Sequence, residues 1–356
     1  MSWKEVIGQD RAIEVFRRAV ACGRLASTFL LVGPAGVGKR LVAEKLAQAL
    51  LCEKCGDHQL EACGHCPSCL QVAAGSHPDV LRIRKPDDKA FIPIDLLIGD
   101  KEHRMRAGLC YDISLRPYSG KRRIAILDDA DYLNQEGANA LLKTLEEPPP
   151  KSVLLLLGTS LQRQLPTIRS RCQIVPFRPL SVEAIEKILL QQQLVMESEQ
   201  AHKVAVQSDG SLENAQAVLA PGFSDFRSML LESLADGEFD LLAVAKATAA
   251  FVDTAGKDAA QKRLRLKHVI GIGLSFLRQV LLQQAGEGAS SSASPDQELT
   301  GAAARALRWY QSGAVDGIDA CIQAMGYVDS NANQANLIEW WLDELVQRGI
   351  VASQRS

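Results

Sequence analysis

The amino-acid sequence predicts an α/β domain with a parallel β-sheet, followed by an all-helical region that fills the rest of the chain. Up to Pro179, short apolar segments of strand length alternate with segments of helical periodicity. Strands separated by helices form parallel sheets whose faces the helices cover. A glycine-rich loop that starts at Gly33 joins one predicted strand to a helix. After Pro179 the strand pattern ceases, so the remainder is predicted to be helical.

Each predicted strand of the first half is a short, mainly apolar run. The predicted strands are residues 29–32, 80–84, 123–127, 153–157 and 173–177. One helix is predicted over residues 40–51, where apolar residues recur at helical spacing. Another is predicted over residues 134–145. The proline triplet that begins at Pro148 stops it, because proline cannot continue a helix.

The helical region divides into a small unit and a larger one. Helices are predicted over 181–192, 197–208 and 212–220 in the small unit, and over 262–284 and 336–348 among the longer helices that follow. The serine-rich segment 286–295 is predicted to be a flexible loop between helices. We therefore expect three domains, at residues 1–179, 180–220 and 221–356.

The composition argues against several classes of protein. The 40 Lys and Arg residues against 42 Asp and Glu give a net charge of −2, so no broad basic surface predicts autonomous binding to nucleic acid. No apolar run approaches the roughly 18–20 residues that span a bilayer, and the first residues, MSWKE, are not typical of a signal peptide. Nine cysteines, five of them from Cys52 to Cys69, indicate a metal site in a reducing compartment. We expect a cytoplasmic protein without a membrane segment.

The glycine-rich loop has the sequence GPAGVGKR and lies between a predicted strand and a predicted helix, which is the context of a phosphate-binding P-loop. Gly33, Gly36 and Gly38 let backbone N–H groups converge on phosphate oxygens, and Lys39 adds charge toward the β- and γ-phosphates. The motif requires a Ser or Thr hydroxyl next, as a ligand of Mg²⁺, but this chain has Arg40. A guanidinium cannot coordinate a cation. We expect a former nucleotide site that binds ATP or ADP weakly or not at all and does not hydrolyse ATP.

Two carboxylates, Asp128 and Asp129, follow the strand predicted at 123–127. In P-loop enzymes this strand lies beside the phosphate loop, its first carboxylate holds Mg²⁺, and the next polarises the attacking water. Asp128 suits the first role. Asp129 stands where Glu is usual and is one methylene shorter, which reduces its reach. The alternative is that these acids, with Asp131, cap the helix that follows.

A cluster of cysteines follows the helix predicted at 40–51: Cys52, Cys55, Cys63, Cys66 and Cys69. The last three have the spacing C-x₂-C-x₂-C, and Cys52 or Cys55 supplies a fourth thiolate. Short spacers let sulfurs converge on one tetrahedral ion, which suits a structural Zn²⁺. Iron–sulfur clusters use similar spacing, but one compact set with a glycine at its turn favours zinc. His58 and His65 are weaker candidates as ligands.

The four remaining cysteines are scattered along the chain and are expected to be ordinary core thiols. They are Cys22, Cys110, Cys172 and Cys321.

In chain order, several motifs match one family. They are Ile7-Gly8-Gln9, the degenerate P-loop, the cysteine insertion after the first helix of the loop, His77-Pro78-Asp79, LRPY at 115–118, NALLKTLEEPP at 139–149 and TIRSRC at 167–172. The last two are very specific. The chain resembles the δ′ subunits of bacterial DNA polymerase III clamp loaders, which are AAA+ proteins. The resemblance is close over the α/β half and extends to the helical remainder in layout only.

The resemblance implies an AAA+ domain with a zinc-binding insertion at 52–69, a small helical lid domain and a helical collar domain for oligomerisation. It implies that Arg171 inserts into the ATP site of a neighbouring subunit as an arginine finger acting in trans. The alternative for that arginine is an ion pair within the chain, a role for which Arg169 is better suited. By position, Cys52 matches the first zinc ligand of the family. The long gap between Cys52 and Cys63 keeps Cys55 as a competitor.

One departure from the ATPase members of the family concerns Glu213. The γ/τ subunits carry a nucleotide-sensing arginine shortly after a Gly-Ser pair, whereas Glu213 follows Gly210-Ser211-Leu212 here. A carboxylate at that position repels a triphosphate. Together with Arg40, this implies a rigid subunit, a stator, that does not hydrolyse ATP.

The resemblance also implies partners. The chain would join γ/τ and δ subunits in a hetero-pentamer that places a sliding clamp on primed DNA, as part of a DNA-directed DNA polymerase holoenzyme. Two alternatives stay open. One is an active γ/τ-like ATPase. The other is a zinc-containing DNA-binding module, to which the basic residues Lys121-Arg122-Arg123 would contribute, although a solvated strand flank is the commoner role of such a run.

Overall fold

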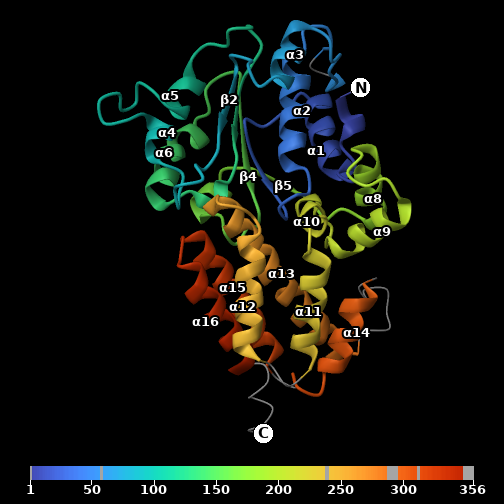
Figure 1. Ribbon diagram of the computed structural model, residues 1–356. Helices are drawn as coiled ribbons and strands as arrows, with labels where there is room; N and C mark the ends of the chain where they lie inside the picture. The colour runs from blue at the N-terminus through green and yellow to red at the C-terminus, as the bar shows by residue number, and fades with distance from the viewer. Residues whose placement is uncertain (1, 57–58, 237–239, 287–295, 311–312, 348–356) are drawn as a thin grey trace. The chain divides into compact units, whose positions relative to one another are not determined.

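In the computed structural model of the protein, residues 2–56, 59–236, 240–286, 296–310 and 313–347 are described (Figure 1). The backbone separates into two compact units. The first comprises Met1–Met196 and Asp209–Glu213, and the second comprises Glu197–Ser208 and Asn214–Ser356. This boundary crosses the segment 180–220, and the division into three domains stays a prediction. Among the described residues, no helix combines the length and hydrophobicity needed to cross a membrane.

The first unit contains one parallel sheet of five strands in the order β2-β3-β4-β1-β5. Its strands are β1 (Thr28–Val32), β2 (Val80–Ile83), β3 (Arg123–Leu127), β4 (Ser152–Gly158) and β5 (Gln173–Pro176). All five predicted strands are confirmed to within one residue at each end. Every residue of β1 and β4 is buried, because these strands lie inside the sheet and both faces are covered.

Helices surround this sheet and connect its strands. They are η1 (Ser2–Glu5), α1 (Asp10–Ala21), α2 (Lys39–Leu51), α3 (Pro67–Ala73), α4 (Ile94–Ile98), α5 (Leu109–Ser114), η3 (Ala130–Tyr132), α6 (Gln135–Glu146), α7 (Pro166–Arg169) and α8 (Val182–Gln191). The helices predicted at 40–51 and 134–145 are confirmed as α2 and α6. The side chain of Asn134 caps α6 by accepting a hydrogen bond from the N–H of Gly137 at 2.8 Å.

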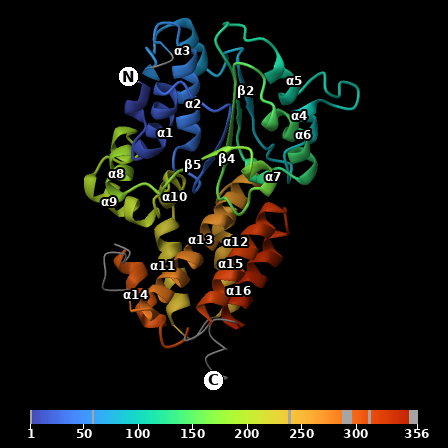
Figure 2. The same cartoon turned by 180° about the vertical axis from the view of Figure 1, so that it is seen from behind.

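Two apolar layers hold the helices to the sheet. Successive strand residues point to opposite faces, so Phe29 and Leu31 of β1 pack with α1 and α2, whereas Leu30 packs with α4, α5 and α6. Figures 1 and 2 show these helix groups on the two sides of the sheet. The strands all run in the same direction, so their carboxyl ends share one edge of the sheet, where functional residues of α/β proteins gather.

The second unit is helical, as predicted. Its helices are α9 (Ser198–Gln207), α10 (Leu212–Val218, whose first two residues belong to the first unit), α11 (Phe223–Ala235), α12 (Leu241–Asp253), α13 (Ala259–Gln284), α14 (Gln297–Ala306), α15 (Ala314–Asp329) and α16 (Gln334–Leu345). The helix predicted at 262–284 is confirmed as α13. The last position of the helix predicted at 336–348, and residues 287–295 of the predicted loop, lie outside the described residues.

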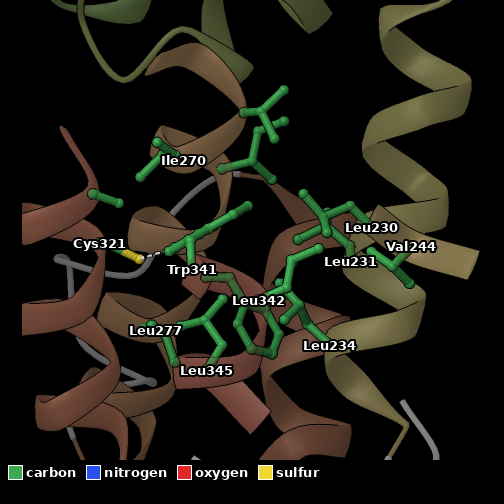
Figure 3. Close-up of a cluster of buried hydrophobic side chains, with 14 of the residues drawn as sticks. Leu230, Leu231, Leu234, Val244, Ile270, Leu277, Cys321, Trp341, Leu342 and Leu345 are labelled. Atoms are coloured by element: carbon green, nitrogen blue, oxygen red, sulfur yellow. Dashed lines mark hydrogen bonds between the residues drawn. The ribbon is translucent and has the colours of Figure 1, made fainter. Parts of the chain in front are cut away.

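A continuous apolar core joins α11, α12, α13, α15 and α16. Figure 3 shows Trp341 of α16 within it, and the indole N–H of Trp341 donates a hydrogen bond to Sγ of Cys321 at 3.3 Å. A charged pair is buried among the described residues of this unit. The guanidinium of Arg227 lies 2.5 Å from the carboxylate of Asp296, and both side chains are only 6% exposed. A buried charge is strongly destabilising without a partner, so this pair fixes α11 against the start of α14.

Candidate functional sites

The glycine-rich loop joins the carboxyl end of β1 to α2, which confirms the predicted strand–loop–helix context. Gly36 and Gly38 have φ of +69° and +94°, which is backbone that favours glycine. Gly33 is needed for a different reason, since a Cβ atom there would lie 2.5 Å from the carbonyl oxygen of Phe177. The loop leads directly into α2 and its unpaired first-turn N–H groups, which makes this end of the helix a favourable place for an anion.

Lys39 is folded back onto the loop. Its Nζ donates hydrogen bonds of 2.6 Å each to the carbonyl oxygens of Gly33 and Pro34. Burial lowers the pKa of Lys39, and this effect is opposed by nearby carboxylates, chiefly those of Asp131 and Asp128. The ammonium group of Lys39 therefore lies near the carboxylates of Asp131 and Asp128.

The residues at the two positions that hold magnesium in P-loop enzymes, Arg40 and Asp128, contact each other instead. Nη1 of Arg40 lies 3.7 Å from Oδ2 of Asp128, so the carboxylate in the metal-binding position is paired with the residue that replaces the metal-binding hydroxyl. Asp129 is also paired, with Nε of Arg84 at 3.7 Å. Burial, followed by the charge of Asp128, raises the pKa of Asp129. These residues do not fit a Mg²⁺ ion, because one ligand is missing and the other is neutralised.

The alternative that these acids cap the next helix is wrong for Asp129 and Asp131. Asp129 precedes η3 but makes no capping hydrogen bond with its side chain. Asp131 instead accepts hydrogen bonds from the N–H and Oγ1 of Thr159, at 2.8 and 2.6 Å, and from the amide of Gln164. This network links the carboxyl ends of β3 and β4 and was not predicted. Its signal was available, because Thr159 is a polar residue just after a predicted strand.

The segment 210–213 lies directly against the phosphate loop. The N–H of Leu212 donates a hydrogen bond of 3.0 Å to the carbonyl of Gly36. A Cβ atom on Gly36 would lie 2.6 Å from the backbone nitrogen of Glu213. The structure thus brings Glu213 beside the loop, where its carboxylate adds to the negative charge that acts on Lys39.

The cysteine cluster is assembled from the end of α2, the start of α3 and the loop between them. The Sγ atoms of Cys52, Cys63, Cys66 and Cys69 all lie within 4.8 Å of one another, with 3.9 Å between those of Cys63 and Cys69. Cys55 is not part of this group. Four sulfurs at this separation could bind one metal ion.

Backbone N–H groups point at these sulfurs. Sγ of Cys52 accepts from the N–H groups of Cys55 and Cys63 at 3.4 Å each, and Sγ of Cys63 accepts from Cys66 at 3.3 Å. Burial alone would raise the pKa of Cys52, but these hydrogen bonds outweigh it and lower the pKa to about 6. The arrangement therefore favours the thiolate form of Cys52, whereas burial raises the pKa of Cys69. His65 is exposed, and Nδ1 of its ring lies 2.8 Å from the carbonyl oxygen of Cys63; His58 lies outside the described residues.

Distant residues hold the cysteine loop in place. The indole of Trp3 donates to the carbonyl of Leu60 at 2.7 Å, and the side-chain amide of Gln48 donates to the carbonyl of Cys69 at 3.0 Å. Lys121 donates to the carbonyl of Cys52. The expectation that Lys121-Arg122-Arg123 is a solvated strand flank is therefore wrong. All three residues are half-buried, and the ammonium of Lys121 supports the cysteine loop.

The expectation that the other cysteines lie in the core holds only in part. Cys110 and Cys321 are buried and Cys172 is half-buried, but Cys22 is exposed. Cys22 is the residue directly after α1. It is therefore not part of the helix face that packs on the sheet.

The His77-Pro78-Asp79 motif organises the backbone beside the cysteine loop. Nδ1 of His77 accepts from the N–H of Asp79 at 3.1 Å, and Nε2 of His77 lies 3.4 Å from Oγ of Ser68. The fully buried carboxylate of Asp79 accepts from the N–H groups of Tyr118 and Ser119 at 2.7 and 2.8 Å. Burial raises the pKa of Asp79, but these hydrogen bonds outweigh it, so that the pKa lies below its usual value.

We expect Asp79→Asn to lower the free energy of unfolding by about 1–3 kcal/mol at neutral pH, because the neutral amide offers a single acceptor oxygen to the two N–H groups that a buried carboxylate binds in the wild type. A carboxylate with a depressed pKa stabilises the fold above its unfolded pKa of about 3.9, and this contribution is lost as the pH falls through the folded pKa. The difference between variant and wild type should thus shrink below about pH 4. Urea unfolding at several pH values measures this. Asp88→Asn, at an exposed carboxylate, is the control and should show little change.

Arg171 lies at the opposite edge of the sheet from the phosphate loop. It follows α7 and precedes β5, and its carbonyl accepts a hydrogen bond of 2.8 Å from Thr28, the first residue of β1. Its guanidinium pairs with Glu146 of α6, with Nε at 2.7 Å and Nη2 at 2.5 Å from Oε1. Nη1 also donates to the carbonyl of Thr167 and to Oγ of Ser170, at 3.0 Å each.

The expectation that Arg169 rather than Arg171 makes an intrachain ion pair is wrong. Arg169 is exposed and, among the described residues, has no acidic partner, whereas Arg171 has Glu146. The reason is the short helix α7, which turns the side chain of Arg171 toward the end of α6.

The strand order, the phosphate loop after β1 and the paired carboxylates after β3 define an α/β domain of the AAA+ class. Residues 8–181 match the family model described as "DNA polymerase III, delta subunit". The match covers slightly less than half of the chain.

Individual relatives are also named as subunits of DNA polymerase III. The chain is 34% identical over 210 residues to DNA polymerase III subunit delta′ of Pseudomonas aeruginosa, covering 59% of this chain and 60% of the relative. For subunit delta′ of Bacillus subtilis the identity is 33% over 193 residues, covering 54% of each chain. Subunit tau of Escherichia coli is 30% identical over 218 residues, which cover 60% of this chain and 32% of that protein. Each match thus spans less than two thirds of the relative.

A solved structure of a DNA polymerase III gamma subunit-related protein from Thermotoga maritima aligns over 95% of this chain and 99% of its own. Its sequence identity is 17% and its TM-score is 0.40. A likeness at this level adds nothing to the functional assignment.

Proposed function

We propose that the protein is a δ′-like subunit of the DNA polymerase III clamp loader that does not hydrolyse ATP and acts as a stator when the sliding clamp is loaded onto primed DNA. The observation that carries this proposal is the ion pair between Arg40 and Asp128. It replaces both protein ligands of the magnesium ion that a P-loop ATPase needs, within a chain whose α/β region is related to subunits delta′ and tau.

The surroundings of the phosphate loop support a silent ATP site. Glu213 stands beside the loop where the ATPase members of the family carry an arginine. Lys39 is bonded to carbonyl oxygens of its own loop. A triphosphate would therefore meet a carboxylate at one side and would lack a metal ion to neutralise its charge at the other.

The position of Arg171 supports a role toward a neighbouring subunit. It lies at the amino ends of β1 and β5, away from the chain's own phosphate loop, and 31% of its side chain is exposed. A planar guanidinium at such an edge can stabilise charge on the γ-phosphoryl group of an adjacent site. Here Arg171 acts as the arginine finger in trans, after exchanging Glu146 for the phosphate.

The proposed partners are γ/τ and δ subunits in a hetero-pentamer, with clamp and DNA reached through that complex in the cytoplasm. Residues 180–220 would act as a lid domain, and residues 221–356 as a collar that oligomerises. Exposed apolar side chains on α15, Val315 and Ile322, support a protein contact on the collar.

We also propose that Cys52, Cys63, Cys66 and Cys69 bind one structural Zn²⁺ ion. Tetrahedral four-sulfur sites suit zinc and leave no open position for catalysis. The placement of Cys52 inside the group of four sulfurs, and of Cys55 outside it, supports Cys52 as the fourth ligand.

Assembly tests the proposed function. The full chain, co-expressed with the γ/τ and δ subunits of the same organism, should copurify as one complex through size-exclusion chromatography. The reconstituted complex should load a sliding clamp onto primed DNA, and leaving this chain out should abolish loading. Normal loading without this chain would contradict the proposal.

For the isolated chain, we expect no ATP turnover above a blank. Arg40→Thr alone should not create an ATPase, because Glu213 remains beside the loop and no nucleotide-sensing arginine is restored. Release of inorganic phosphate, measured with a γ/τ subunit as the positive control, checks both variants. Turnover by the wild-type chain at a rate comparable with that subunit would show that the phosphate loop is active.

A further inference from the structure

The ion pair of Arg40 and Asp128 places a permanent positive charge at the metal position of the phosphate loop. The two residues come from different elements, the first turn of α2 and the end of β3, and meet at 3.7 Å. Their side chains are 58% and 26% exposed, so the pair lies at the surface, within reach of a ligand on the loop. A divalent ion would have to displace the guanidinium from the carboxylate against repulsion of like charge.

Apart from the position of Arg40, the phosphate loop keeps the features with which P-loops bind phosphate. Gly36 and Gly38 have the positive φ values that glycine allows, and α2 is a regular helix of 13 residues whose amino terminus favours an anion. Lys39 is held by neutral carbonyl oxygens, which an ionised phosphate replaces readily, since charge-assisted hydrogen bonds are about twice as strong as neutral ones. The loop thus offers two cationic side chains, Lys39 and Arg40.

The acidic residues limit how many phosphates the site can accept. Asp131, Asp128 and Glu213 all act on Lys39, and Glu213 lies directly beside the loop. A third phosphate group, extending past Lys39, adds charge near these carboxylates without a metal ion to offset it. The site is therefore suited to two phosphate groups.

We propose that Arg40 takes the place of the magnesium ion, so that the phosphate loop binds a diphosphate group without any divalent cation. The diphosphate is that of a nucleoside diphosphate or a free pyrophosphate, because nothing in the loop itself distinguishes the two. This inference concerns ligand binding by the single chain and does not depend on the clamp-loader assignment. Its failure would leave the assembly test unaffected, and failure of assembly would leave the binding test unaffected.

Isothermal titration calorimetry of the full chain tests this, with ADP, ATP or pyrophosphate, each in excess magnesium chloride and in EDTA. For the wild type we expect the Kd of ADP to agree within about twofold between the two conditions, because the cation is built in. ATP should bind more weakly than ADP in EDTA. If pyrophosphate binds as tightly as ADP, the diphosphate alone is the recognised group. If pyrophosphate binds more weakly than ADP, the nucleoside contributes to recognition. Either result supports the proposal.

Variants at position 40 separate this mechanism from ordinary P-loop binding. Arg40→Thr restores the metal-binding hydroxyl, so its affinity for ADP should fall at least about tenfold in EDTA and recover with magnesium. Lys39→Ala should lose binding in both conditions. Arg24→Thr removes an arginine that is exposed and outside the loop, and should behave as wild type.

Circular dichroism and thermal unfolding establish that each variant is folded before titration. The proposal is overturned if the wild type binds ADP at least about tenfold more tightly with magnesium, if it binds neither ADP nor pyrophosphate, or if Arg40→Thr shows no new dependence on magnesium.

Discussion

Arg171→Ala is expected to produce the largest functional change in the assembled complex, by slowing ATP hydrolysis at the neighbouring subunit's site by about 10³–10⁵-fold, the range of arginine fingers supplied in trans. Turnover summed over the complex should fall less, because other sites keep their own fingers. Clamp loading should slow as well. Phosphate release with clamp and primed DNA present, and clamp loading by the same preparation, measure both effects.

Arg169→Ala is the matched control for this prediction. It removes an exposed arginine from the same short motif and should leave turnover unchanged. Arg171→Lys should rescue poorly, because an ammonium lacks the bidentate geometry of a guanidinium. Size-exclusion chromatography must first show that each variant assembles. If Arg171→Ala assembles normally and the complex hydrolyses ATP at the wild-type rate, Arg171 is not a finger.

The pair with Glu146 adds a structural requirement to this role. Nε, Nη1 and Nη2 of Arg171 are all engaged within the chain, with Glu146, Thr167 and Ser170. To form two hydrogen bonds with a phosphate, the guanidinium has to give up part of this set. Entry of a triphosphate next to Arg171 would compete with the carboxylate of Glu146 for the same donors.

Loss of the metal should have the largest effect on stability. Apparent binding energies of structural zinc are about 10–16 kcal/mol in small zinc-finger peptides, and the cysteine loop has a small apolar core of its own, made mostly of the cysteines themselves. Cys63→Ser should therefore abolish zinc binding and unfold the segment between α2 and β2, while the sheet keeps its separate core. Elemental analysis of the reduced protein and limited proteolysis of this segment check the two parts.

Cys55→Ser is the control for the ligand set. Because Cys55 lies outside the group of four sulfurs, this variant should keep one zinc per chain, whereas Cys52→Ser should lose it. The reverse result would exchange Cys55 for Cys52 in the ligand set. Wild-type protein purified under reducing conditions without zinc would refute the metal site altogether.

How much of the fold could be predicted depends on the length and burial of each element. β1 and β4 are buried along their whole length and therefore apolar without interruption, so their positions were predicted to within one residue. The helices α4, α5 and α7 have only four to six residues each, too few to show helical periodicity, and were not predicted.

The candidate functional sites also differ in how far they could be predicted from the sequence. The four clustered sulfurs were predictable because their spacing is local in the sequence. The contact of Arg40 with Asp128 was not predicted, although the two residues lie in motifs whose positions in a P-loop fold are fixed. The pair of Arg171 with Glu146, and the network of Asp131, Thr159 and Gln164, depend on how loops at the two edges of the sheet are packed. The packing of these loops has no periodic sequence pattern from which it could be predicted.

The parallel sheet makes the two ends of its strands different from each other. All five strands run the same way, so the phosphate loop and the guanidinium of Arg171 lie at opposite edges of the same domain. Consider a row of subunits in which each inserts an arginine finger into the ATP site of the next. As proposed here, this chain could insert Arg171 into a neighbour's site, but it would have no active ATP site for a neighbour's arginine. It would serve as a terminus, and a row that it closes cannot turn into a uniform ring. If the proposed function holds, the polarity of the strands would thereby fix which side of the chain a neighbour must occupy.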